Sequence, residues 1–413
     1  MTILILLLYL AVLAIECGLT LLNNRHLQRH GHELPPEFAG TIEPATLARS
    51  ADYTLAKGQF GLAHGLFDSG LTLAFIFGGP LAWYDRLIGS YDLGFIVSGL
   101  LFFLLLSLAK TLLDIPFSLY SHFRIESRFG FNRMGFGLWC SDLLKSLLIS
   151  TLLFGLLGTA ALWLIRTAPQ SWWLWVWGLL VGFGLLIMVI SPYLIEPLFF
   201  KFAPLKVEGL EERIRAMLEK VGLAAGKVLQ VDASKRSGHS NAYFTGFGRQ
   251  KRVVLFDTLL EQLSADEVLA VLAHELGHMK MKHILKRMLL MAGAALLYCW
   301  LAQALVGWQA LPQLVGLEQA SFYARLVILF FLAGILTFPL TPLFAALSRR
   351  GEYQADRFAA NLHGKPEDLA TALIRMSKEN LANLHPHPLY ARFHYSHPPV
   401  VERIRNLRKL TSG

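Results

Sequence analysis

Long apolar runs constrain the fold of this chain more than any other feature. Only 16% of its 413 residues are charged, against about 25% in soluble globular proteins, and several runs approach the ~20 residues that a helix needs to cross a bilayer. We therefore expect a predominantly α-helical, polytopic membrane protein with seven transmembrane helices. The predicted spans are Ile3–Leu22, Gly61–Trp83, Leu93–Leu113, Leu143–Ile165, Trp172–Phe200, Met288–Trp308 and Leu326–Leu347. The second half of the fifth run is expected to leave the bilayer at its prolines.

The first run is interpreted as a span and not as a cleaved signal peptide. It lacks a positively charged start and a clear small-x-small cleavage site. The three cysteines, Cys17, Cys140 and Cys299, lie in or beside apolar segments and far apart in the sequence. We interpret them as small buried hydrophobes, so no disulfide framework is indicated.

The distribution of basic residues predicts the orientation of the spans. Net charge is +9, and the connection 309–321 contains no Lys or Arg, whereas the connections on the other side are rich in them. Those residues are Arg25, Arg29, Arg49, Lys57, Arg124, Arg128 and Arg133, together with many in 201–286 and in the C-terminal segment. Because basic loops stay in the cytosol, we expect the N-terminus outside and both large polar segments inside. The excess charge reflects topology, and no nucleic-acid partner is expected.

The spans divide the chain into four parts. We expect transmembrane helices 1–5 with their loops in 1–200, a cytosolic protease segment in 201–286, transmembrane helices 6–7 in 287–347 and a C-terminal cytosolic helical segment in 348–413. In the second part, GLEERIRAMLEKVGL predicts an amphipathic helix, and VLQVDAS, NAYFTGFG and RVVLFDTLL predict strands of a small sheet. Ser264 and Glu267 form a capping box that opens a helix expected to continue through Ile284.

The motif His274-Glu275-Leu276-Gly277-His278 indicates a metal site with a general base beside it. On a helix the two histidines project from one face and can bind one metal ion. Zinc accepts imidazole nitrogens and in catalytic sites takes a third protein ligand and a water. Glu275 lies beside that face, where it can take a proton from a water that the metal activates. The alternative is a solvated amphipathic helix, which the apolar flanks of the motif disfavour.

A candidate third ligand follows two spans later. In SRRGEYQADRFAANL, Glu352 and Asp356 share a helical face, and the out-and-back hairpin returns them to the side of the membrane that carries His278. Glu352 can complete a His₂Glu site, and Asp356 can accept the free N–H of a ligand histidine. The alternative is an ordinary helix with ion pairs to Arg350 and Arg357. His283, five residues beyond His278, is expected on another face in a structural or interfacial role.

Four segments resemble the Ste24-type (CAAX prenyl protease 1) zinc metalloproteases of the M48 group. They are KRSGHSNAYFTGFGRQKRVVLFDTLL, LAHELGHMKMKH, LSRRGEYQADRFAANL and HYSHPPVVERI, and the seven spans match as well. The resemblance implies a barrel of seven helices around a water-filled chamber and a cytosolic zincin-like α+β domain with one Zn²⁺ per chain. It also implies His274, His278 and Glu352 as metal ligands and Glu275 as the general base.

The resemblance implies further site residues. His397 and Arg403 match family positions near the metal, where His397 can stabilise an oxyanion; the alternative is a histidine that merely precedes a helix. The segment Asn241, Ala242, Tyr243, Phe244 and Thr245 resembles the edge strand on which zincins lay substrate by main-chain pairing, unless it is an interior strand. Among ionisable residues within spans, Lys110 and Asp114 are expected to pair with each other.

We expect a zinc endopeptidase that cleaves peptide or protein substrates at the cytosolic face of a bacterial inner membrane. The Leu/Ala-rich composition, the compact loops and the lack of a retrieval signal in RNLRKLTSG favour bacteria. Turnover of damaged membrane proteins is the expected role, with prenylated CAAX peptides as substrates in vitro. The alternatives are a site-2-type intramembrane metalloprotease and a non-catalytic membrane chaperone or scaffold with a structural zinc.

Overall fold

The computed structural model describes residues 1–246 and 250–411. Seven of its helical segments are long and apolar enough to cross a membrane, which matches the number predicted. They comprise α1 (Thr2–His30), α2 (Pro44–Phe77), α4 (Gly94–Tyr120, continued by a π-helix at Ser121–Glu126), α5 (Phe136–Thr167), α6 (Trp172–Leu194), α11 (His283–Val306) and α12 (Phe322–Thr337) with α13 (Thr341–His363). Many of their large apolar side chains are exposed, as expected where lipid and not protein covers them.

Proline and glycine end these helices at places that the apolar runs do not reveal. The second span ends at Phe77, before Gly79 with φ 99°, so Trp83 belongs to a separate helix, α3 (Pro80–Gly89). The last run is also not one helix, because the 3₁₀ turn Phe338–Leu340, which contains Pro339, separates α12 from α13. Proline lacks an N–H and clashes with the preceding turn. In the fifth run α6 ends at Leu194, two residues beyond Pro192, and α7 (Glu196–Phe199) follows; the exit of this run from the bilayer at its prolines stays a prediction.

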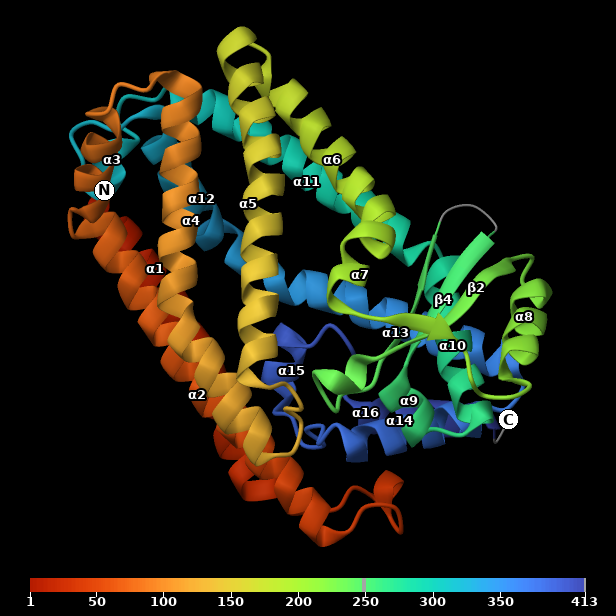
Figure 1. Cartoon of the computed structure of the whole chain (residues 1–413). Helices are drawn as coiled ribbons and strands as arrows, with labels where there is room; N and C mark the ends of the chain where they lie inside the picture. The colour runs from red at the N-terminus through yellow and green to blue at the C-terminus, as the bar shows by residue number, and fades with distance from the viewer. Residues whose placement is uncertain (247–249, 412–413) are drawn as a thin grey trace.

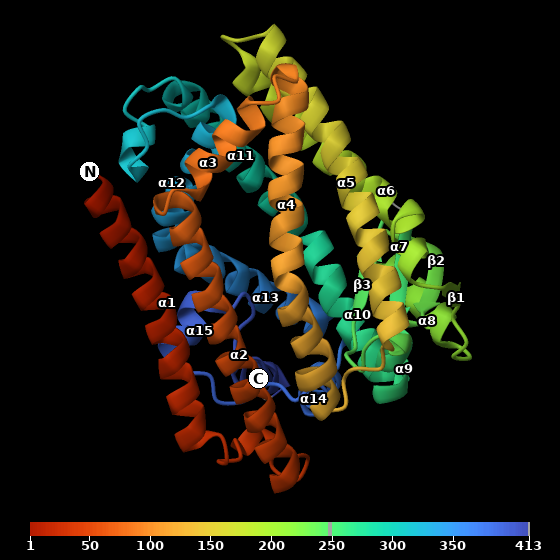
Figure 2. The same ribbon diagram turned by 60° about the vertical axis from the view of Figure 1, so that its left-hand side comes forward.

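The membrane helices form a ring. Along it α1 packs on α2, α2 on the π-helical end of α4, α4 on α5, α5 on α6 and α6 on α11, and α12 closes the ring between α11 and α1. Figure 2 shows α1, α2, α4, α5 and α6 side by side, with α11 and α12 behind them. Helix α13 leaves the ring and runs to the smaller mixed α/β part, where it meets α10 (Figure 1).

The α/β part contains a four-stranded sheet in the order β1-β2-β4-β3. Its strands are β1 (Phe202–Pro204), β2 (Ala224–Val231), β3 (Ala242–Thr245) and β4 (Gln250–Phe256). Strands β2 and β4 are parallel, and β3 is antiparallel to β4 with Ala242 opposite Leu255. The three predicted strands are present, but DTLL is the helix α9 (Asp257–Gln262) and not a strand. The Asp257 carboxylate accepts hydrogen bonds from the Ser234 and Thr258 N–H groups, which starts a new element there.

Helices pack around the sheet and form one apolar core with it. They are α8 (Leu210–Lys220), α10 (Ala265–Lys280), α14 (Pro366–Glu379) and α16 (Val400–Thr411), with part of α13. Helix α15 (Pro388–His394) packs on α13 and α1, and short 3₁₀ turns lie at Pro36–Phe38, Ala233–Lys235 and, among the membrane helices, Pro312–Val315. Leu255 of β4, Leu272 of α10 and Ile404 of α16 are completely buried in this core. The predicted capping box of Ser264 and Glu267 opens α10. The core therefore fixes α10, which carries the HELGH motif, on almost every side.

Candidate metal centre

Helices α10 and α13 approach unusually closely at Gly277. A Cβ atom at this position would lie 2.8 Å from Ala355 Cα and 3.1 Å from Ala355 O, both in the backbone of α13. Only glycine allows this contact. The close approach brings the face of α10 that carries the two histidines against the face of α13 that carries Glu352.

The Nε2 atoms of His274 and His278 and the carboxylate of Glu352 form a triangle of candidate ligands, in which each nitrogen faces a different carboxylate oxygen. Nε2 of His274 lies 3.2 Å from Nε2 of His278 and 3.4 Å from Oε2 of Glu352, and Nε2 of His278 lies 3.3 Å from Oε1 of Glu352. Ligand atoms on a tetrahedral zinc with bonds of about 2.0–2.1 Å are roughly 3.3–3.4 Å apart. Glu352 is 3% exposed, and its Oε2 has no hydrogen-bond partner among the described residues. The donor set and spacing therefore fit a zinc ion.

A buried ion-pair network contacts Nδ1 of His274, the ring nitrogen opposite the candidate metal-binding Nε2. Asp356 Oδ1 lies 2.8 Å from Nδ1 of His274, and Arg403 of α16 donates to both Asp356 oxygens, from Nε at 2.9 Å and Nη2 at 2.7 Å. Burial opposes protonation of His274, but Asp356 and Glu352 outweigh it and raise the pKa of the imidazole. Burial likewise acts against the Arg403 charge, yet Asp356 keeps the pKa of the guanidinium raised. Asp356 thus pairs with Arg403, and its contact with Nδ1 leaves Nε2 facing the triangle.

His283 holds the other histidine, and its position corrects the expectation from the sequence. Helix α10 ends at Lys280, Lys282 adopts a left-handed conformation with φ 57°, and His283 opens α11. The break turns His283 back, so that its Nδ1 lies 3.0 Å from Nδ1 of His278 and its Nε2 lies 2.9 Å from Oε1 of Gln354. A continuous helix would place His283 on another face. No glycine or proline marks the break at Met281 and Lys282, which is why the sequence did not reveal this contact.

Glu275 and His397 lie near the three candidate ligands. Burial raises the pKa of Glu275 above its ordinary 4.5, against the opposing effect of the nearby histidines. His397 places Nε2 3.3 Å from Oε1 of Glu352, while 63% of its side chain is exposed. Arg349 of α13 donates to the Tyr395 carbonyl at 2.7 Å and so fixes the segment that carries His397.

Strand β3 is an edge strand, as expected from the sequence. Its only strand neighbour among the described residues is β4. Ala242 and Phe244 face the main core, whereas the Tyr243 hydroxyl donates to Glu196 Oε2 at 2.7 Å. Asn241 uses Oδ1 to accept the Ala242 N–H at 2.8 Å. The side chains of Ala242, Tyr243 and Phe244 are thus engaged within the protein.

A second cluster of ionisable residues lies within the membrane helices. Lys110 donates to Asp114 at 2.6 Å, as expected, and also lies 3.1 Å from Asp68 and completes a network with His64. The ammonium group occupies the space between the two carboxylates. Lys110 thus offsets one of the two carboxylate charges within the membrane helices, and the donor atoms of His64, Asp68 and Asp114 lie close enough together to hold a metal ion.

Comparisons with known proteins agree with this geometry. Residues 23–201 match the family described as CAAX prenyl protease N-terminal, five membrane helices, and residues 204–411 match Peptidase family M48. The chain belongs to peptidase family M48. The M48 assignment is consistent with the human CAAX prenyl protease 1 homolog, which is 33% identical over 94% of this chain and 91% of its own length. The Saccharomyces cerevisiae CAAX prenyl protease 1 is 34% identical over 91% and 88%.

The fold agrees as well. The crystal structure of S. mikatae Ste24p superimposes with a TM-score of 0.91 at 31% identity, and the match covers 98% of both chains. This M48 protein is therefore an integral, multi-pass membrane metalloprotease, and the resemblance noted in its sequence is confirmed.

Proposed function

We propose that this M48 protein is a zinc endopeptidase in which His274, His278 and Glu352 hold one zinc ion. The observation that carries the proposal is the triangle of two Nε2 atoms and a buried carboxylate with separations of 3.2–3.4 Å. When bound, zinc lowers the pKa of a coordinated water and polarises the scissile carbonyl. Among the described residues this group of ligands has three members, which favours an open catalytic position over the four-ligand closure of a structural zinc.

The residues around the three candidate ligands supply the general base, the donor to the oxyanion and the orientation of His274. Glu275 acts as general base, and its raised pKa keeps the proton available for transfer to the leaving amine. His397 donates a hydrogen bond to the developing oxyanion, which its exposed position beside Glu352 favours. Asp356 and Arg403 orient His274. The peptide adds to the free edge of β3, at Asn241–Thr245.

The placement of α10 bears on the competing intramembrane mechanism. A site-2-type protease carries its HExxH motif within a transmembrane span, whereas α10 is not one of the seven helices apolar enough to cross a membrane. Its core position beside the sheet favours cleavage at the membrane surface, and the basic connections favour the cytosolic side. We propose a bacterial inner-membrane location, damaged membrane proteins as physiological substrates and, given the names of the relatives, prenylated CAAX peptides as substrates in vitro.

Glu275→Gln tests the mechanism. The variant is expected to retain zinc and lose cleavage of a reporter peptide, because the amide keeps the shape of the site and cannot accept the proton. Full activity in Glu275→Gln would contradict the mechanism. In cells, mass spectrometry of membranes carrying this variant should show accumulated membrane proteins; an unchanged membrane proteome would remove support for the quality-control role.

A further inference from the structure

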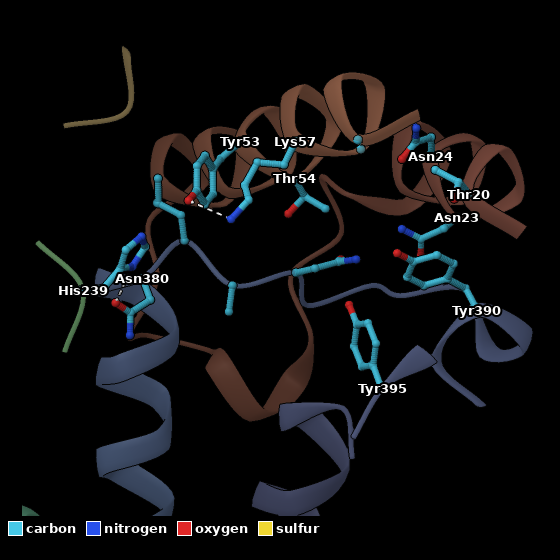
Figure 3. Close-up of a pocket in the computed structure, with 15 residues that line it drawn as sticks. Thr20, Asn23, Asn24, Tyr53, Thr54, Lys57, His239, Asn380, Tyr390 and Tyr395 are labelled. Atoms are coloured by element: carbon cyan, nitrogen blue, oxygen red, sulfur yellow. Dashed lines mark hydrogen bonds between the residues drawn. The ribbon is translucent and has the colours of Figure 1, made fainter. Parts of the chain in front are cut away.

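The segment 238–240, which leads into strand β3, is held by side chains from three distant parts of the chain. Thr258 of α9 donates to the His239 carbonyl at 2.9 Å, and Oδ1 of Asn380, the residue after α14, lies 3.1 Å from Nδ1 of the His239 ring. Oε2 of Glu126, the last residue of the π-helix, lies 3.4 Å from Nε2 of the same ring. Figure 3 shows the contact between His239 and Asn380. None of these four residues has a role in the mechanism proposed above.

Both ring nitrogens of His239 face oxygen atoms. The Asn380 amide donates from Nδ2 to the Ser240 hydroxyl at 3.3 Å, which leaves its oxygen toward Nδ1, and the partner of Nε2 is a carboxylate. Carbonyl and carboxylate oxygens accept hydrogen bonds, so the ring joins Glu126 to Asn380 when both nitrogens donate. Phe131 stacks on the ring with 4.2 Å between the centroids, which fixes the plane in which the two nitrogens lie.

The membrane helices fix the carboxylate of Glu126. It ends the π-helix Ser121–Glu126, which continues α4; single π-helical turns of this kind are rare and occur frequently at functional sites. Only 17% of the Glu126 side chain is exposed. Its Oε1 accepts the Tyr53 hydroxyl of α2 at 2.8 Å and lies 3.8 Å from Lys57 Nζ, while Oε2 remains for His239. The contact with His239 therefore ties α2 and α4 to the start of β3.

Strand β3 needs such support because it lies at the edge of the sheet. An edge strand that accepts a peptide is paired on one side only until the peptide arrives, and β4 is the only strand beside β3 in the described part of the chain. His239 precedes Ala242, the first residue of β3, by three positions, or at most about 10 Å of extended chain. Helix α10, which carries two candidate metal ligands, packs on β3. A shift of His239 would thus move the free edge of β3 relative to the metal centre.

We propose that His239 is a positioning residue, which uses its contacts with Glu126 and Asn380 to hold β3 where an incoming peptide pairs with it. The inference rests on the proposed pairing of substrate with β3, and it makes the membrane helices part of the substrate-binding site. His239, Glu126 and Asn380 form no hydrogen bond or ion pair with a candidate metal ligand among the described residues. They therefore act on substrate binding and leave zinc binding unchanged.

Cleavage of the reporter peptide by zinc-loaded, full-length enzyme tests the inference in His239→Asn, Glu126→Gln and the double variant. Each single change should raise KM about 3- to 10-fold, in line with the loss of one hydrogen bond, with kcat within about twofold and zinc content unchanged. The double variant should raise KM no further, because both changes remove the same contact. His32→Asn and Glu219→Gln are matched controls at exposed positions and should keep the wild-type KM.

Peptides in which one amide nitrogen at a time is methylated separate positioning from a merely structural role. Methylation of an amide that pairs with β3 removes a main-chain hydrogen bond and should raise KM for the wild type about 3- to 10-fold. In Glu126→Gln and His239→Asn the same methylation should raise KM less, because the strand is no longer held for pairing. A structural role would leave the effect of methylation as large as in the wild type.

Four results would overturn the inference. They are a wild-type KM in both single variants, effects that multiply in the double variant, an undiminished effect of methylation in the variants, and no effect of methylation at any position with the wild type. Each of them leaves the zinc peptidase function standing, whereas equal cleavage by wild type and Glu275→Gln would remove the function itself.

Discussion

Gly277→Ala tests whether the contact between α10 and α13 builds the metal centre. The added Cβ would lie 2.8 Å from Ala355 Cα, whereas carbon atoms in contact are about 3.5–4.0 Å apart. The helices must therefore separate by roughly 0.7–1.2 Å. The obstructing Cα and O atoms belong to the backbone, so no change of rotamer can relieve the clash.

The separation acts on the ligands directly, because α10 carries the two histidines and α13 carries Glu352. Metal sites tolerate deviations of about 0.2 Å in their ligand distances. We expect zinc affinity to fall about 10- to 100-fold, as for loss of a residue that orients a ligand. Overpacking costs about 1–3 kcal/mol and the better helix propensity of alanine returns about 1 kcal/mol, so global stability should fall only modestly.

Competition with a chromophoric chelator measures the zinc affinity of Gly277→Ala, and thermal unfolding in detergent measures its stability. Gly155→Ala is the control, because a Cβ at that position within α5 meets no atom within 4 Å. The control should bind zinc as the wild type does. Wild-type zinc affinity in Gly277→Ala would refute the claim that this contact sets the ligand geometry.

Three further results are expected. His283→Ala removes the hydrogen-bond partner of His278 Nδ1 and should speed zinc dissociation about 10- to 100-fold, measured by stopped-flow chelation. An unchanged dissociation rate would show that His283 does not orient His278 toward the metal. Burial raises the pKa of Glu275 above its ordinary 4.5. As the pH falls through this raised pKa, the general base is protonated and activity is lost. A profile of kcat/KM against pH whose acid limb has its midpoint at or below 4.5 would contradict this. Arg403→Met should lower zinc affinity, because Asp356 would lose both guanidinium hydrogen bonds, and calorimetry showing wild-type affinity would argue against an orienting role.

The sequence predicted those parts of the molecule that depend on local pattern. Seven apolar runs are sufficient to predict seven helical spans, because a run of about 20 apolar residues satisfies its own backbone in lipid as a helix, whereas the strands of a membrane barrel need only about 10 residues. The spacing of the HELGH and EYQAD motifs predicted which faces of their helices meet. The hairpin of spans six and seven then required Glu352 to return to the side of His278, and the two residues lie together in the structure.

Features that depend on the turn between two helices were not predictable. The break at Lys282 carries no glycine or proline, so His283 appeared to continue α10 on another face. Strand β1 has three residues, too few for an alternating pattern to show. The end of the second span at Phe77 was obscured because Trp83 and its neighbours in α3 are also apolar.

The zinc content of Glu352→Gln, purified beside the wild type, tests the central claim most directly. Elemental analysis after dialysis should find about one zinc ion per wild-type chain, because the α13 carboxylate completes the triangle with His274 and His278. Glu352→Gln keeps the shape but removes the charge and should lose most of its zinc. A full complement of zinc in Glu352→Gln would show that α13 does not supply the third ligand, and the account of this site would be wrong.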